Sequence, residues 1–404
     1  MKLIYISSIY HPDYLAYFKS NSNNLLQNAA EVFQNAIYDG LCQNNINFHL
    51  ISLPSLPAYP IRYNKLMTPQ AKFIHNTKDV GTMLSFCNLL VYKTLSMRIN
   101  LYRYLSKWFK ENCRKDEKVV ILTYTPYPPF IKALKKLKKQ YPNCVVSSII
   151  TDLVDDMFFF AENRKILKRI QAWLEIRDTK KLYNVIDKYI LLTKNMEEKI
   201  PESISRNIIV EGIYSGTAND TPSNEYKDKV VLYSGSLDEF SGVKDLVDAF
   251  MLTNNKDFQL VICGKGFLEN YIKKMALLDR RIIFLGQVER NRVIDLQYKA
   301  KALINPRSPG HSITKYSFPS KTMEYLASGT PMIGYKLEGI PNEYYTYMYT
   351  VDKLSIEELS RKISEVLLLP QEVLYAKGLS AKRFILENKT AKIQVNRIVD
   401  FIYN

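Results

Sequence analysis

Long apolar runs are missing from this sequence of 404 residues. Because no run reaches about 18 apolar residues, we expect no segment to cross a bilayer as a helix. The N-terminal stretch MKLIYIS is too short for a signal peptide and leads directly into an expected strand. Internal repeats and low-complexity tracts are missing as well. We therefore expect a folded, cytoplasmic protein.

Cysteine and histidine are scarce. The five cysteines are odd in number and widely spaced, without the paired spacing of metal-binding motifs. We expect them to be reduced thiols. Only four histidines occur, which disfavours chemistry that depends on several convergent imidazoles.

Positive charge, in contrast, is in excess. The sequence has 56 Lys and Arg against 40 Asp and Glu, a formal net charge of +16. This predicts an anionic partner, either nucleic acid or an anionic membrane surface. Residues 130–141 and 91–110 are predicted helices rich in basic residues, and the second has the composition of a helix lying on a membrane. The alternative for each is a packed amphipathic helix with a solvated basic face. No nucleic-acid-binding module is recognisable, so we expect no nucleic-acid partner.

Apolar strands alternate with helical segments along the whole chain. Predicted strands are residues 3–7, 47–52, 118–123, 144–150 and 185–192, then 229–234, 258–263, 281–285 and 302–305, with a helix at 24–42. This order predicts two α/β domains with parallel sheets. The polar stretch at residues 216–229 reads as a linker. We predict domains at residues 1–210 and 211–385, followed by a last helix at 386–404.

The most informative segment is residues 303–341. We predict a helix that begins near Ser317, with Ser317 as N-cap and Pro319 in its first turn, and that ends at Gly329. Its free backbone N–H groups and positive dipole end favour a bound anion. Lys321 adds a full charge there, and Glu324 lies one turn further along, where it can accept two ribose hydroxyls. The alternative for Glu324 is a surface ion pair with Lys321.

This segment resembles family 4 of the retaining, nucleotide-sugar-dependent glycosyltransferases of group 1. The donor motif of that family is Glu, seven residues, Glu, then a helix ending in a Gly-x-Pro turn. Glu324 matches the second glutamate, whereas Tyr316 stands in place of the first. Phe318, Pro319 and Ser320 replace the usual Phe-Gly-x loop. Residues 316–331 look like a subgroup in bacterial capsule and exopolysaccharide assembly.

The rest of the C-terminal half matches the family in order. The strand at 229–234 leads into Gly235 and GSLDEFSGVKDLVDAF, where Ser236 and Ser241 occupy the positions of two basic residues that usually clamp the diphosphate. The resemblance implies that Lys321, Lys315 and Arg307 meet this charge instead, with Lys321 and Arg307 stabilising the leaving group. The implied donor site consists of Lys315, Tyr316, Ser317, Phe318, Pro319, Ser320, Glu324, Gly235, Ser236, Gly264 and Val288.

The acceptor side is less clearly marked. Residues 151–156, TDLVDD, follow an apolar strand, so their polar groups should point into a cleft. Asp152 is the catalytic candidate, and Asp155 and His11 are acceptor-side candidates. The alternatives are a solvated acidic loop and, less favoured, a metal site, since the family generally needs no bound metal.

The resemblance implies the GT-B fold, in which two Rossmann-like parallel-sheet domains face a cleft and the C-terminal helix crosses back to the first domain. We predict a hexosyltransferase that moves a sugar from a nucleoside diphosphate donor to a lipid-linked or polysaccharide acceptor. No tightly bound cofactor is expected. The enzyme would be peripheral on the inner face of the cell membrane. The alternatives are a GT-B nucleotide-sugar epimerase and a basic nucleic-acid-binding or scaffold protein without enzymatic activity.

Overall fold

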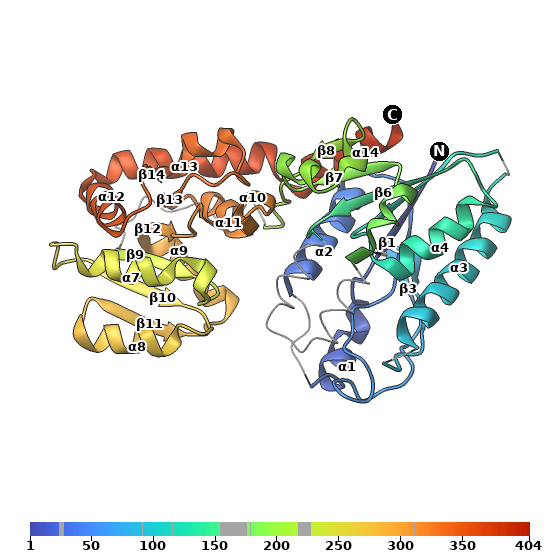
Figure 1. The fold of residues 1–404 in the computed structure, drawn as a ribbon, viewed down its shortest axis with the longest axis horizontal. Helices are drawn as coiled ribbons and strands as arrows, with labels where there is room; N and C mark the ends of the chain where they lie inside the picture. Colours follow the sequence, from blue (N-terminus) through green and yellow to red (C-terminus); the bar gives the residue numbers. More distant parts are fainter. Residues whose placement is uncertain are drawn as a thin grey trace. The chain divides into compact units, whose positions relative to one another are not determined.

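The chain forms two compact units. The structure is a computed structural model that describes residues 1–23, 28–90, 92–114, 116–153, 176–177, 179–216, 228–310 and 312–404. One unit comprises Met1–Ser215 together with Ala391–Asn404, and the other comprises Gly216–Thr390. Each is an α/β unit built on its own sheet (Figure 1).

The described part of the first unit contains an eight-stranded sheet in the order β3-β4-β2-β1-β5-β6-β7-β8. The strands are β1 (Lys2–Ser7), β2 (Phe48–Ser52), β3 (Ala71–His75), β4 (Lys78–Met83), β5 (Val119–Thr123), β6 (Cys144–Ile150), β7 (Lys188–Leu191) and β8 (Asn207–Ile209). All neighbours pair in parallel except β3 and β4. Because both faces of the central strands are covered, β5 and β6 are almost continuously apolar and buried.

Helices cover both faces of this sheet (Figure 1). They are α1 (Leu15–Ser20), α2 (Asn28–Gln43), α3 (Lys93–Asn112), α4 (Pro128–Lys138) and α14 (Ala391–Tyr403). Helix α14 packs against α2, and α3 packs against α4. The apolar stripe of α3, including Met97, Leu101 and Leu105, is buried. The apolar stripe of this helix is therefore used in packing, as in the packed amphipathic alternative, and membrane association stays a prediction.

Two features at the edges of the first sheet differ from the prediction. The hairpin of β3 and β4 was not predicted, because its sequence is polar. It turns at Asn76 and Thr77, both with positive φ. The predicted strand at 185–192 begins only at Lys188, since Val185 ends a 3-10 turn. It is also not the last strand, because the short, half-buried β8 follows.

The second unit has, in its described residues, a six-stranded parallel sheet in the order β11-β10-β9-β12-β13-β14. The strands are β9 (Asp228–Ser234), β10 (Gln259–Cys263), β11 (Ile282–Gly286), β12 (Ala300–Asn305), β13 (Met332–Tyr335) and β14 (Tyr349–Val351). The strand order reverses between β9 and β12. In a doubly wound sheet, ligands bind beyond the carboxyl ends of the strands at this point.

The helices of the second unit are α7 (Val243–Met251), α8 (Glu269–Leu278), α9 (Arg290–Lys299), α10 (Ser312–Tyr316), α11 (Ser320–Ser328), α12 (Ile356–Leu368) and α13 (Gln371–Asn388). Helix α7 packs against α8 and α12, whereas α11 packs against α9 and α13. The four predicted strands of this half are confirmed. The strands β13 and β14, of four and three residues, are too short for a clear periodic signal.

Helix α14 depends on close approach to α2 at Gly40. A Cβ atom built on Gly40 would lie 2.4 Å from Val395 Cγ2 and 2.5 Å from the Ala391 carbonyl oxygen. We expect Gly40→Ala to destabilise the protein by about 1 to 2 kcal/mol, because overpacking outweighs the gain in helix propensity. The control is Gly310→Ala, whose Cβ would meet only Ser308 Oγ within 4 Å. Urea unfolding followed by circular dichroism measures both, and equal midpoints would contradict the packing argument.

Candidate active site

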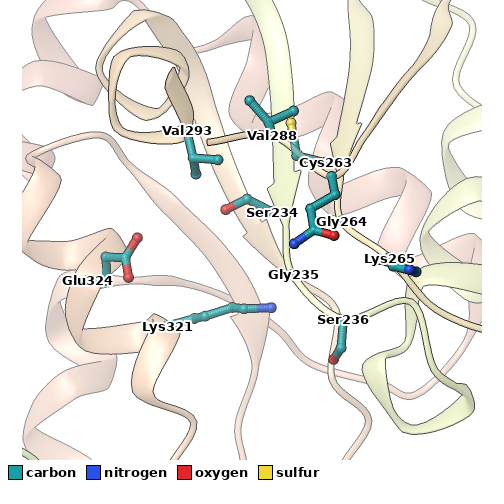
Figure 2. A pocket seen from close by; sticks show the side chains of 11 residues that line it. Ser234, Gly235, Ser236, Cys263, Gly264, Lys265, Val288, Val293, Lys321 and Glu324 are labelled. Atoms are coloured by element: carbon teal, nitrogen blue, oxygen red, sulfur yellow. The ribbon is translucent and has the colours of Figure 1, made fainter. Parts of the chain in front are cut away.

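A pocket opens at the carboxyl ends of β9 and β10, beside the point where the strand order reverses. Its volume is about 330 Å³, which is within the range of small-ligand sites. Its lining comes from the loops after three strands and from two helices (Figure 2). The lining residues are Ser234, Gly235, Ser236, Cys263, Gly264, Lys265, Gln287, Val288, Val293, Lys321 and Glu324.

Two glycines let the backbone come close to the pocket. A Cβ atom on Gly235 would lie 1.3 Å from Lys321 Nζ, so a side chain there would displace the ammonium group. Gly264 has φ +146°, and its Cβ atom would lie 1.7 Å from the Gly235 carbonyl oxygen. Gly264 therefore requires glycine, whereas a side chain at position 235 would change the position of Lys321. The prediction that Gly235, Ser236, Gly264 and Val288 lie together is consistent with this geometry.

Helix α11 supplies the charged groups and is tied to β9. Tyr325 is fully buried, and its hydroxyl accepts a hydrogen bond from the Ser234 backbone N–H at 2.9 Å and donates to the Ser234 carbonyl oxygen at 3.1 Å. One side chain thus satisfies both backbone groups at the end of a strand. This fixes the rotation of α11, so that Lys321 and Glu324 face the pocket.

The start of α11 differs from the prediction. The helix begins at Ser320, its N-cap is Pro319, and no side chain caps it. Ser317 is therefore not the N-cap. A proline disfavours helical geometry in the residue before it, which stops the helix from extending back through Phe318. The predicted end at Gly329 is confirmed, with φ 75°. In this first turn the Thr322 N–H donates to the Pro319 carbonyl oxygen at 2.8 Å, and the positive end of the helix dipole favours an anion nearby.

The Lys321 ammonium lies deep in the site. Its Nζ is 5.0 Å from the centroid of the Tyr233 ring, and Figure 2 shows it extended toward Gly235 and Ser236. The pKa of Lys321 is lowered to about 8, mainly by burial and in small part by Arg307, against the attraction of Glu324 and Asp238. A cation that is held partly desolvated beside another cation favours an anionic ligand.

Arg307 lies next to the pocket but does not line it. Its Nη2 is 3.4 Å from Ser317 Oγ, and its Nε is buried without a hydrogen-bond partner among the described residues. Burial lowers the pKa of Arg307, opposed by Asp238 and Tyr233. Lys265 is the second cation in the pocket lining, beside Lys321, and had no predicted role.

Glu324 is held by a residue that the sequence did not reveal. Its Oε1 accepts a hydrogen bond from Gln297 Nε2 at 2.8 Å, and Gln297 itself is 2% exposed. No ion pair joins Glu324 to Lys321, although both lie in the described part of the chain. The alternative of a surface ion pair is therefore wrong. The carboxylate is instead oriented by an amide, which leaves its other oxygen for a ligand.

Other predicted donor residues lie outside the pocket. Lys315 Nζ is 4.0 Å from the Glu338 carboxylate and sits over the ring of Tyr316. Phe318 is 8% exposed, with its ring centroid 5.3 Å from that of Tyr344. Lys315, Tyr316 and Phe318 precede α11 in the chain, as do Ser317 and Pro319. None of these residues lines the pocket, and neither does Ser320 at the start of the helix. Ser241, which stands at a usual clamp position, is buried and donates to the Asp238 carbonyl oxygen at 2.6 Å.

The acceptor-side candidates belong to the first unit. Asp152 is exposed beyond the carboxyl end of β6 and accepts a hydrogen bond from Thr151 Oγ1 at 3.1 Å. His11 is 8% exposed, and both ring nitrogens are engaged, Nε2 with the Lys72 carbonyl oxygen and Nδ1 with the Asp13 N–H. His11 therefore stays an acceptor-side prediction, with its ring held within the first unit. Asp155 lies outside the described residues.

Cys263 lines the pocket but is not a nucleophile. Burial raises the pKa of its thiol to about 11, so the reactive thiolate is scarce at neutral pH. Within the described residues, no group of three or more His, Cys, Asp or Glu side chains is placed to hold a metal ion. The chemistry that the pocket itself offers is the binding of an anion and of hydroxyl groups.

Comparison with known families identifies the second unit. The profile of the family Glycosyl transferases group 1 matches residues 217–379, which include the whole pocket. The chain carries a glycosyltransferase domain. This confirms the prediction of a glycosyltransferase, and the position of Lys321 and Glu324 inside the domain assigns the pocket to it. A comparison with curated proteins gave no match.

Solved structures confirm the GT-B fold. A mutant of S. aureus TarM in complex with fondaparinux, alpha-GlcNAc-glycerol and UDP is 11% identical, with a TM-score of 0.62 over 100% of both chains. The sucrose-phosphate synthase of Thermosynechococcus elongatus is 13% identical, with a TM-score of 0.64 over 100% of this chain and 98% of its own. A structure from E. coli, described as trehalose-6-phosphate bound with UDP-2-fluoro glucose, has a chain that is 10% identical. Its TM-score is 0.61 over 100% of this chain and 99% of its own.

Binding of a diphosphate should depend on pH through Lys321. The pKa of its ammonium is lowered to about 8, so the positive charge is complete below pH 8 and is lost as the pH rises through 8. We expect the affinity for UDP, measured by calorimetry, to fall by up to about tenfold per pH unit above 8. The phosphate groups of UDP ionise near pH 6 and are therefore fully charged there, and inorganic pyrophosphate, which lacks the ionisable uracil ring, is titrated as the control ligand. Lys321→Met should bind weakly with a flat profile. A slope that persists in this variant would assign the titration to another group.

Gln297 should affect binding only through Glu324. We expect Glu324→Ala to weaken the binding of a nucleoside diphosphate sugar by about 1.5 to 3 kcal/mol, the range for hydrogen bonds to charged groups. Gln297→Leu removes the amide that holds the carboxylate and should cause a smaller loss. In the double variant the Gln297 change should add almost nothing, because its partner is already gone. Fully additive losses would show that Gln297 acts independently of Glu324.

Proposed function

We propose that this protein is a retaining glycosyltransferase that transfers a hexosyl unit from a nucleoside diphosphate sugar to a lipid-linked or polysaccharide acceptor. The observation that carries the donor part is the arrangement on α11. Lys321, in the first turn of α11, lines the same pocket as Glu324, one turn later. An anionic diphosphate and a ribose, linked as in a nucleotide, match these two groups in charge and in hydrogen bonding.

The departing diphosphate would be stabilised mainly by electrostatics. Lys321, Arg307 and the backbone N–H groups of the first turn of α11 are fixed before the ligand arrives, and such preorganised groups typically supply several kcal/mol of transition-state stabilisation. They meet the negative charge that develops on the leaving oxygen. The buried position of Lys321 strengthens this interaction because little water screens it.

Retention of configuration is inferred from the resemblance to family 4. In that mechanism the leaving phosphate itself takes the proton of the acceptor hydroxyl, so no side-chain base is required. The scarcity of histidine supports this route, as does the structural role of His11, whose two nitrogens are both engaged. Asp152, exposed at the end of β6, is the proposed acceptor-side carboxylate.

A nucleotide-sugar epimerase of the same fold is disfavoured by the lining of the pocket. Such chemistry calls for paired carboxylates and histidines around the sugar. Among the residues that line the described pocket, Glu324 is the one carboxylate, and no histidine is present. Capsule or exopolysaccharide synthesis is proposed from the resemblance of residues 316–331 to that subgroup.

The proposal is tested with a panel of nucleoside diphosphate sugars. Mass spectrometry should detect slow hydrolysis or transfer with one donor, and NMR should show that the product keeps the anomeric configuration of the donor. Lys321→Ala should reduce turnover by about 100-fold or more, on the scale seen when one transition-state donor is removed. The control is Lys244→Ala, since Lys244 lies on α7 and pairs with Asp248 at 2.8 Å.

Inversion of configuration would refute the retaining part of the proposal. Thermal stabilisation tests the nucleotide part without any knowledge of the sugar. If UDP and related diphosphates leave the melting temperature unchanged while RNA raises it, the transferase is refuted and the nucleic-acid alternative is favoured.

A further inference from the structure

The first unit exposes a group of apolar side chains on two adjacent segments, residues 59–68 and 87–95. Bridges join Tyr59 to Leu89 and Met67 to Cys87, and the Asn88 N–H donates to the Leu66 carbonyl oxygen at 2.7 Å. We call the exposed group the apolar patch. Its seven described members are 40% to 63% exposed and are Ile61, Leu66, Met67, Leu89, Leu90, Tyr92 and Leu95.

The apolar patch is distinct from the buried face of α3. The stripe through Met97, Leu101 and Leu105 packs into the core, whereas the apolar patch consists of the two loops and the first turn of the helix. The Lys93 ammonium donates a hydrogen bond to the Leu56 carbonyl oxygen, which ties the second segment to the chain just before the first. A group of exposed apolar side chains on adjoining segments is typical of an interaction site.

The surroundings of the apolar patch are strongly basic. Residues 53–70 and 84–110 contain seven Lys and Arg and no Asp or Glu. The exposed basic side chains nearest the apolar patch in sequence are Arg62, Lys65 and Arg98, whereas Arg103, Lys107 and Lys110 lie further along α3, where Lys107 is 3.8 Å from Glu111. A surface that combines aliphatic side chains with an excess of positive charge is complementary to the anionic headgroups and acyl chains of a bilayer.

Other occupants match the apolar patch less well. Single-stranded nucleic acid binds through aromatic stacking, but six of the seven members are aliphatic. In a symmetric dimer the same surface meets itself, which would place positive charges opposite one another without acidic partners. Protein interfaces are depleted in lysine. In the described residues no helix combines the length and apolarity needed to cross a membrane, so a lipid contact would be made at the surface.

We propose that the apolar patch docks on an anionic lipid surface, with its aliphatic side chains at the boundary between headgroups and acyl chains and the basic residues against lipid phosphates. The two segments follow β2 and β4, so the apolar patch lies toward the carboxyl edge of the first sheet. Beyond the same edge lies Asp152, the proposed acceptor-side carboxylate. A lipid-linked acceptor would thus be presented from the bilayer to this edge, a step that rests on the proposed function.

The test is co-sedimentation of the full chain with vesicles of phosphatidylcholine, with and without phosphatidylglycerol. We expect binding to the anionic vesicles that weakens with added salt. Leu90→Ser with Tyr92→Ser should reduce this binding by about tenfold or more, because each side chain loses apolar contact. Arg62→Gln with Lys65→Gln should also reduce it by about tenfold or more, since each basic residue near an anionic surface contributes about a fivefold effect.

Matched controls come from the second unit. Leu277→Ser with Leu278→Ser removes side chains that are 86% and 68% exposed on α8, and Lys274→Gln with Arg280→Gln removes the same charge. Both controls should bind as the wild type does. Circular dichroism checks that all variants are folded, and the charge pair provides a second test if the apolar pair does not fold.

Three results would overturn the inference. They are no binding of the wild type to anionic vesicles, equal binding by the patch variants and the wild type, and a dimer in light scattering that the apolar variant abolishes. If RNA displaces the protein from the vesicles because the protein binds RNA with higher affinity, the apolar patch is a nucleic-acid-binding surface instead. Thermal stabilisation by UDP without vesicles tests the proposed function separately, so the two failures can be distinguished.

Discussion

The candidate active site depends on one buried contact, between the Tyr325 hydroxyl and the backbone of Ser234. This contact joins the middle of α11 to the last residue of β9 and uses the N–H and C=O groups that the strand leaves unpaired at its end. Once the rotation of α11 is fixed, Lys321 reaches over Gly235 and Glu324 meets Gln297. The pocket therefore results from how one helix is held against one strand. Its charged groups are positioned by these buried contacts and not by residues on the protein surface.

The central strands could be predicted from the sequence because a parallel strand that is covered on both faces must be apolar along its length. Strands β5, β6, β9 and β12 satisfy this condition, and each was predicted. The hairpin of β3 and β4 lies at the sheet edge, where one side faces solvent and polar residues are tolerated. Its turn at Asn76 and Thr77 lacks the glycine that usually marks a tight hairpin, so no local signal indicated it.

The site could be predicted where its residues lie close together in the sequence, as Lys321 and Glu324 do on one helix. It was not predictable where function rests on contacts between distant segments. Gln297 holds Glu324 from a different helix, and no spacing in the sequence connects them. Phe318 was assigned to the donor because of its place in a motif, whereas the structure buries its ring against Tyr344. A residue's position in a motif thus locates its backbone but does not determine where its side chain points.

The excess positive charge serves two different physical roles in this chain. At Lys321 and Arg307 the charges are few, partly desolvated and mutually repulsive. Desolvation and repulsion raise the free energy of the unliganded protein, and an anion bound beside both cations reduces this cost. Around the apolar patch the charges are exposed and screened, and each contributes little by itself. The first arrangement selects a compact multivalent anion by its shape. The second is the one proposed to bind an extended anionic surface, and therefore the net charge alone does not identify either partner.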